Sequence, residues 1–372
     1  MKLLRPDYNN CLVNLSNSFL NKYGVPTFHS TMKDVDDILL KHDKVVVLLF
    51  DGMGKALLDR HLSPDHPFRR TVFKTITSTF PPTTVAATTS LLNGKFPIET
   101  GWLGWNQYFK EFKRNVDVFN NDDSVTKVKV APGNALKEKA PYDGILTLIS
   151  RKHPELYVTS LWPTIVAGGT VADLPDFFTK MEFICSDSRP KFIYGYWHQP
   201  DGLIHQNGVG APIVHQTIED IARGVLDLAK KHEDTLFLVL ADHGLVDVDF
   251  LAMEEHADFY ATTKRMFSNE PRAPFFFVKP LQKKRFEKLF ERYYGQEFIL
   301  LKRKEVLEQQ WFGEGKPHPV CKEFIGDYMA VAIDYKAFDY LIDGKIAHAK
   351  FKAHHAGMTE DEMLIDLMIL NQ

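Results

Sequence analysis

The chain has 372 residues, enough for one large α/β domain with a substantial buried core. Its 45 Lys and Arg residues and 48 Asp and Glu residues give a formal net charge of -3, so the composition does not indicate a protein that encloses nucleic acid or binds membranes through a basic surface. Any attraction for phosphate must therefore be local.

The cysteines and the N-terminus indicate the cellular compartment of the protein. Cys11, Cys185 and Cys321 lie far apart without a Cys-x-x-Cys pair, which fits buried thiols in a reducing compartment. The N-terminus becomes polar at Arg5, before an apolar signal region can develop, and no stretch approaches the roughly 18 apolar residues of a membrane span. We therefore expect a cytoplasmic protein without a membrane span, and the sequence is silent on its oligomeric state.

Four apolar runs predict the strands of a central sheet. They are residues 45–50, 156–161, 192–197 and 236–241. Continuous apolar strands separated by helices are typical of a parallel sheet covered on both faces. Before the last strand, apolar residues at steps of four and three predict one helix face: Val214, Ile218, Ile221, Val225 and Leu228. The pattern predicts a three-layer α/β/α sandwich with a mostly parallel central sheet.

Acidic residues follow three of these strands: Asp51, Asp201 and Asp242. Ligands bind at the carboxyl ends of the strands in open α/β sheets. We therefore expect one pocket to hold all three acids.

The region from residue 247 to residue 350 has a different pattern. It reads as a strand (275–278), a charged helix (282–293), a second strand (298–301) and the start of a short helix (306–310). We therefore divide the chain into a catalytic α/β/α domain of residues 1–246 and 351–372, and a small inserted α+β subdomain of residues 247–350 that caps the sheet and shapes substrate access.

A hydroxyl group is expected at the start of a helix. Pro81 and Pro82 prevent a helix and the small residues after them allow one, so Thr84 falls near a helix N-terminus. Unpaired N–H groups and the helix dipole favour an anion at such a position. Taken alone, the simpler interpretation is that Thr83 and Thr84 only cap the helix.

Carboxylates and histidines recur close together in three further segments. Asp201 and His205 are four residues apart, as ligation from one helical turn requires. Asp242 and His243 are adjacent, and the following glycine permits a sharp exit from the strand. A histidine pair, residues 354 and 355, precedes an expected C-terminal helix. Each segment alone is weak or modest evidence, but their joint occurrence in this order is improbable by chance.

The order of these segments resembles the alkaline phosphatase superfamily, and most closely its nucleotide pyrophosphatase/phosphodiesterase branch. The resemblance covers roughly residues 45–104, 194–208, 236–246 and 354–363. It implies an alkaline phosphatase-like fold, a phosphodiesterase or pyrophosphatase activity, and a small phosphorylated substrate, for which a nucleotide is one candidate.

The resemblance also implies two metal sites. One would use Asp51, Thr84, Asp242 and His243, and the other would use Asp201, His205 and His355. His355 is preferred to His354 because it directly precedes a small residue and Gly357; His354 is expected to support a ligand from behind. Mixed carboxylate and imidazole ligands suit zinc, with manganese as the alternative.

The implied mechanism follows from these ligands. Two metals about 4 Å apart can stabilise both the entering and the departing oxygen of an in-line displacement. Thr84 would be the nucleophile, would form a phosphothreonine, and water would then hydrolyse this intermediate.

The chain departs from the branch pattern after the nucleophile, where an aromatic residue, Pro and Asn are often found. Here these positions hold Val85, Ala86 and Ala87, so an Asn that would hold phosphoryl oxygens is missing. Asn106 could replace it in substrate binding, although a loop Asn in an ordinary turn is an equal alternative.

Other functions stay open. A phosphomonoesterase, a phosphonate hydrolase or a phosphomutase could use the same metals and threonine, and a binding module could carry the metals without turnover. A sulfatase and a P-loop enzyme are disfavoured because their motifs are absent. Tyr196 and Trp105 are interpreted as core aromatics, and Arg272 as a solvated surface residue.

Overall fold

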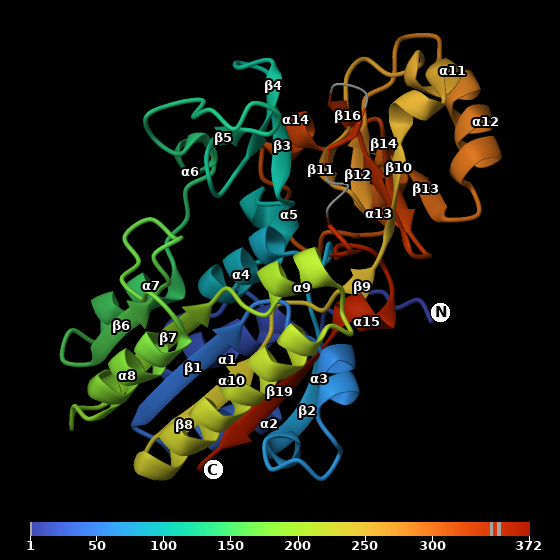
Figure 1. Ribbon diagram of the computed structural model, residues 1–372. Helices are drawn as coiled ribbons and strands as arrows, with labels where there is room; N and C mark the ends of the chain where they lie inside the picture. Colours follow the sequence, from blue (N-terminus) through green and yellow to red (C-terminus); the bar gives the residue numbers. More distant parts are fainter. Residues whose placement is uncertain (1, 343–344, 348–350) are drawn as a thin grey trace.

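A six-stranded sheet with helices on both faces forms the core of the computed structural model, which describes residues 2–342, 345–347 and 351–372 (Figure 1). In spatial order its strands are β2 (Val72–Thr77), β19 (Leu364–Leu370), β8 (Leu236–Leu240), β1 (Lys44–Phe50), β7 (Lys191–Trp197) and β6 (Tyr157–Leu161). The last four are mutually parallel, and β19 runs antiparallel to both of its neighbours. The four predicted strands are confirmed.

Two groups of helices cover this sheet. One consists of α1 (Leu12–Lys22), α2 (Lys33–Leu39), α4 (Thr84–Asn93) and α7 (Ile145–Lys152), and the other of α3 (Lys55–His61), α8 (Leu174–Cys185), α9 (Asp201–Asn207) and α10 (Pro212–Lys231). In Figure 1, α10 lies in front of the sheet and α1 behind it. The five apolar residues predicted for α10 are all buried. The three-layer sandwich is therefore confirmed.

The prediction of a C-terminal helix is wrong beyond the first helical turn. Only α15 (Glu360–Met363) is helical, and the chain then enters β19 between β2 and β8. The apolar run of β19 is compatible with either a helix or a strand, and pairing with two neighbouring strands decides in favour of the strand.

A second, seven-stranded antiparallel sheet lies beyond the carboxyl ends of the central strands. Its order is β13 (Phe298–Lys302), β14 (Tyr328–Ala332), β12 (Ala273–Phe276), β11 (Ser268–Glu270), β3 (Asn106–Phe109), β4 (Arg114–Asp117) and β5 (Asp122–Asp123). Figure 1 shows the teal strand β3 beside the orange β11, so residues 106–123 join a sheet otherwise built from residues 268–332. The domain boundaries at 246/247 and 350/351 stay a prediction, and Met1 and Lys350 lie outside the described residues.

Helices α12 (Lys283–Tyr294) and α13 (Arg303–Glu308) correspond to the two helices predicted in this region. The remaining elements are η1 (Arg69–Thr71), α5 (Pro97–Thr100), α6 (Ala135–Lys139), β9 (Val246–Asp247), β10 (Asp249–Ala252), η2 (Met253–Glu255), α11 (Ala257–Tyr260), α14 (Cys321–Phe324), β15 (Lys336–Asp339), β16 (Leu341–Ile342), β17 (Lys345–Ile346) and β18 (Ala353–His354). None of the described helices is long and apolar enough to cross a membrane. The three cysteines are buried and unpaired.

Candidate active site

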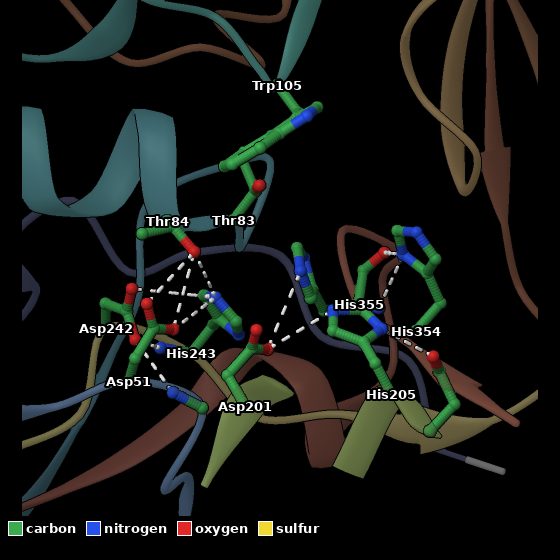
Figure 2. Close-up of polar contacts among 12 residues, drawn as sticks. Asp51, Thr83, Thr84, Trp105, Asp201, His205, Asp242, His243, His354 and His355 are labelled. Carbon is green, nitrogen blue, oxygen red and sulfur yellow. Dashed lines mark hydrogen bonds and ion pairs between the residues drawn. The ribbon is translucent and has the colours of Figure 1, made fainter. Parts of the chain in front are cut away.

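The loops that leave three parallel strands meet at one edge of the central sheet. Asp51 follows β1, Asp201 opens α9 after β7, and Asp242 follows β8. The Asp51 N–H donates to the Trp197 carbonyl (2.9 Å), and the Asp201 N–H donates to the Asp51 carbonyl (3.0 Å). These bonds fix the loops together, and Figure 2 shows Asp51, Asp201 and Asp242 near one another.

Asp51, Asp242 and His243 form the first cluster. All three are buried, and their ligand atoms lie within 4.8 Å of one another. The Thr84 hydroxyl, at the first position of α4, lies 3.2 Å from His243 Nε2 and 3.4 Å from each Asp51 carboxylate oxygen. Asp242 Oδ2 is buried without a hydrogen-bond partner in the described part of the chain. An unsatisfied buried carboxylate oxygen among oxygen and nitrogen ligands fits a divalent cation.

Asp201, His205 and His355 form a second cluster of the same size. Within α9, His205 lies one turn after Asp201, with 3.4 Å between its Nε2 and Asp201 Oδ1. The other ring nitrogen of His205 contacts the Ala353 carbonyl (2.7 Å), which directs Nε2 into the cluster. His355 Nε2 lies 3.9 Å from the same Asp201 oxygen.

A short antiparallel ladder brings His355 to this edge of the sheet. Strand β18 pairs with β9, which places His354 opposite Val246, three residues after His243. His354 Nδ1 accepts a hydrogen bond from the His355 N–H (2.9 Å), so the first histidine of the pair fixes the backbone of the second.

Burial dominates the electrostatics of the site. It raises the pKa of Asp51, with further increases from the Asp242 and Asp201 charges, and it raises the pKa of Asp242 to about 7. Burial, followed by the neighbouring histidines, holds the pKa of His355 well below its usual range. Three clustered carboxylates supply negative charge, and a neutral imidazole has a free nitrogen lone pair. Both features favour the binding of a cation.

Position 244 requires glycine because of packing, and not because of backbone conformation as the sequence suggested. Its φ is not positive. A Cβ at this position would lie 2.0 Å from the Asp361 carbonyl oxygen, so only glycine lets the segment after His243 pass the C-terminal loop.

Sequence reasoning missed several residues that support the site. Tyr196 is buried as expected, but its hydroxyl also donates to Asp51 Oδ2. Glu270, whose pKa burial raises to about 7, accepts hydrogen bonds at Oε1 from the Thr83 hydroxyl (2.7 Å) and the Trp105 N–H (2.6 Å). A carboxylate that reaches the site from the second sheet left no local signal in the sequence.

The interpretation of Arg272 as a solvated residue is wrong. Its side chain is fully buried and donates to both carboxylate oxygens of Glu362, at 2.6 and 2.9 Å. Sequence offers little warning of this, because an arginine is buried only when a distant acid pairs with it.

A pocket of about 340 Å³ opens between the metal-type clusters and the second sheet. Its lining includes Thr84, Trp105, Asn106, Asp201, His205, Glu270, His354 and His355. The Asn106 side-chain oxygen accepts a hydrogen bond from the Asn269 N–H (2.9 Å), which fixes the orientation of the amide. The pocket is therefore lined from both sheets, beside the Thr84 hydroxyl.

Known proteins resemble this chain in sequence pattern and in fold. The family described as type I phosphodiesterase / nucleotide pyrophosphatase matches residues 45–333. No curated protein sequence matches significantly. An inactive variant of murine ectonucleotide pyrophosphatase / phosphodiesterase 5, solved with AMP, has 14% identity and a TM-score of 0.63, with 87% of each chain covered. The human protein has 16% identity and a TM-score of 0.63, covering 88% of this chain and 87% of its own. The likeness to these structures shows the same fold.

Proposed function

Because the chain belongs to the type I phosphodiesterase / nucleotide pyrophosphatase family, a family of hydrolases that act on phosphoric ester bonds, we propose that it cleaves a phosphodiester or pyrophosphate with Thr84 as nucleophile. The observation that carries this proposal is the Thr84 hydroxyl, which lies at a helix N-terminus and within 3.4 Å of both Asp51 and His243.

The two clusters supply ligands for two divalent cations. Asp51, Thr84, Asp242 and His243 would hold one, and Asp201, His205 and His355 would hold the other. Their mixture of oxygen and nitrogen donors suits zinc, with manganese as the alternative. When bound, the cations stabilise negative charge on the entering and departing oxygens of an in-line displacement.

The protein's own groups define the two steps. In the first, a bond forms between Thr84 Oγ and phosphorus while the bond from phosphorus to the leaving oxygen breaks, which gives a phosphothreonine, and the proton lost by Thr84 Oγ departs with the leaving group. In the second, a water oxygen bonds to phosphorus, the bond from phosphorus to Thr84 Oγ breaks, and a proton from the water returns to Thr84 Oγ. The N-terminal amides of α4 face the phosphoryl group in both steps.

We propose a small phosphorylated substrate, with a nucleotide as the leading candidate. Its support is the pocket of about 340 Å³ and the AMP complex of the murine relative. With its oxygen held by Asn269, the Asn106 amide offers its N–H groups to a substrate oxygen. His354 would support the ligand His355 through the backbone bond described above.

Hydrolysis of a nitrophenyl phosphodiester beside its monoester tests the proposal. Metal-free protein resupplied with zinc or manganese should prefer the diester, and Thr84→Ala should lower kcat by at least about 10³-fold while both metals remain bound by elemental analysis. Preference for the monoester would favour the phosphatase or mutase alternatives. Metal binding without any Thr84-dependent turnover would favour the binding module.

A further inference from the structure

Thr83 occupies the N-cap position of α4, but its side chain does not cap the helix. Its backbone is extended (φ -147°, ψ 148°), as N-cap residues usually are, and Thr is a favourable N-cap residue. The hydroxyl nevertheless makes no hydrogen bond to α4 and donates instead to Glu270 Oε1 at 2.7 Å.

The first-turn amides of α4 are consequently left available. Among the described residues, the N–H groups of Thr84, Val85 and Ala86 have no acceptor, and the first backbone bond of the helix runs from Ala87 to the Thr83 carbonyl (2.9 Å). One of these amides belongs to Thr84, whose hydroxyl lies 3.2 Å from His243 Nε2 in the first cluster.

Glu270 is fixed in this position from the second sheet. It is 1% exposed, and the Trp105 N–H holds the same Oε1 at 2.6 Å. The preceding residue, Asn269, has φ +85°, a conformation that non-glycine residues rarely adopt. Three hydrogen bonds of 2.8 to 2.9 Å hold Asn269 there, through its N–H, its side-chain oxygen and its side-chain nitrogen. The backbone is thus constrained at the point from which Glu270 projects.

Glycine at position 104 allows this approach. A Cβ there would lie 2.4 Å from Asn269 Oδ1 and 3.1 Å from Glu270 Cγ. The hairpin that carries Glu270 is also connected to the C-terminal loop, because Arg272 pairs with Glu362, which accepts the Gly357 N–H (2.7 Å). Glu270 is therefore placed relative to both the nucleophile and the loop of His355.

We propose that Glu270 is a positioning residue that holds the Thr83 hydroxyl away from the N-terminus of α4 and so keeps the first-turn amides open for phosphoryl oxygens. The inference rests on the proposed function, since it assigns the phosphoryl group to the amides beside Thr84. Without Glu270, the hydroxyl can rotate to cap the helix and compete with the phosphoryl group.

Binding of orthovanadate, a phosphoryl mimic, to the zinc-loaded protein tests this role. Calorimetry is compared for the wild type and for Glu270→Ala, Glu270→Gln, Thr83→Val and the double variant Glu270→Ala/Thr83→Val, after circular dichroism and zinc content have shown that each is folded and loaded. Glu270→Ala should weaken binding about fivefold to tenfold, as competition by one N-cap bond predicts. Glu270→Gln should restore most of the affinity, because its amide oxygen still accepts from Thr83.

The double variant separates positioning from general structural damage. The double variant has no hydroxyl that could cap the helix. Its Kd for orthovanadate should therefore lie within about threefold of the Kd of Thr83→Val, which is smaller than the tenfold change that corresponds to 1.4 kcal/mol. A double variant as weak as Glu270→Ala, or a Glu270→Gln variant equally weak, would overturn the proposal. Because vanadate binding requires no turnover, a wild type that binds vanadate but cleaves no ester would reject the proposed function instead.

Discussion

Asp51 has two kinds of contact in the site. Its carboxylate is a proposed metal ligand close to the Thr84 hydroxyl, and it accepts a hydrogen bond from the buried Tyr196 hydroxyl. A hydrogen bond from a residue that is not itself a ligand orients a ligating carboxylate. The loss of such a partner typically lowers metal affinity 10-fold to 100-fold. Tyr196 should therefore contribute to metal binding without being a ligand.

Tyr196→Phe is expected to weaken zinc binding at the Asp51 cluster by about 10-fold to 100-fold, measured by competition with a chromophoric chelator. Tyr194→Phe is the matched control. Tyr194 lies on the same strand and is also buried, but its hydroxyl has no hydrogen-bond partner in the described residues. Equal zinc affinities in the two variants would show that the Tyr196 hydroxyl does not orient Asp51.

At the scale of elements, one buried ion pair connects the β11–β12 hairpin to the loop that carries His355. Arg272 and Glu362 are both fully buried, and Glu362 also accepts from the Thr359 hydroxyl (2.7 Å). Additional contacts of this kind are what a buried pair needs to offset the desolvation of its charges. The pair thus fixes the second sheet against the metal-type clusters.

Arg272→Met should lower the free energy of unfolding by about 3–5 kcal/mol, because it leaves the Glu362 carboxylate buried without its partner. Urea denaturation measures the change. Lys304→Ala provides the control, since Lys304 and Glu308 form an exposed pair one helical turn apart, and its loss should change the stability by less than about 0.5 kcal/mol. A similar small change for Arg272→Met would mean that the buried pair adds nothing to stability.

Across the whole molecule, folding gathers three carboxylates that repel one another when no cation is present. Asp51, Asp201 and Asp242 come from loops far apart in sequence: the Gly52 N–H donates a hydrogen bond to Asp242, which lies 190 residues after Gly52. Cations that bind only the folded chain therefore stabilise all the elements that carry these ligands.

Removal of the metals should lower the melting temperature by several degrees, and zinc should restore it. A cation present at 100 times its Kd stabilises the folded state by about 2.7 kcal/mol. Thermal unfolding with and without a chelator measures this effect. The double variant Asp201→Asn/Asp242→Asn should respond little to the chelator; an equal response would place the stabilising metal elsewhere.

Local patterns in the amino-acid sequence are enough to predict several parts of this protein. The continuous apolar runs of β1, β6, β7 and β8 and the helical periodicity of α10 are local features, so they were predictable without tertiary information. The order of acids, histidines and threonine sufficed to predict the family. Cytoplasmic localisation and the choice of zinc stay predictions.

Which distant segments meet depends on contacts that form only in the folded chain. Strand β19 replaced an expected helix because β2 and β8 provide pairing on both sides, and β3 joined β11 across more than 150 residues of sequence, with Asn106 opposite Asn269. The contacts of Glu270 with Thr83 and of Arg272 with Glu362 belong to the same class. Local propensity is equally compatible with other partners, and the free energy that selects these comes from burial and pairing that exist only once the chain has folded.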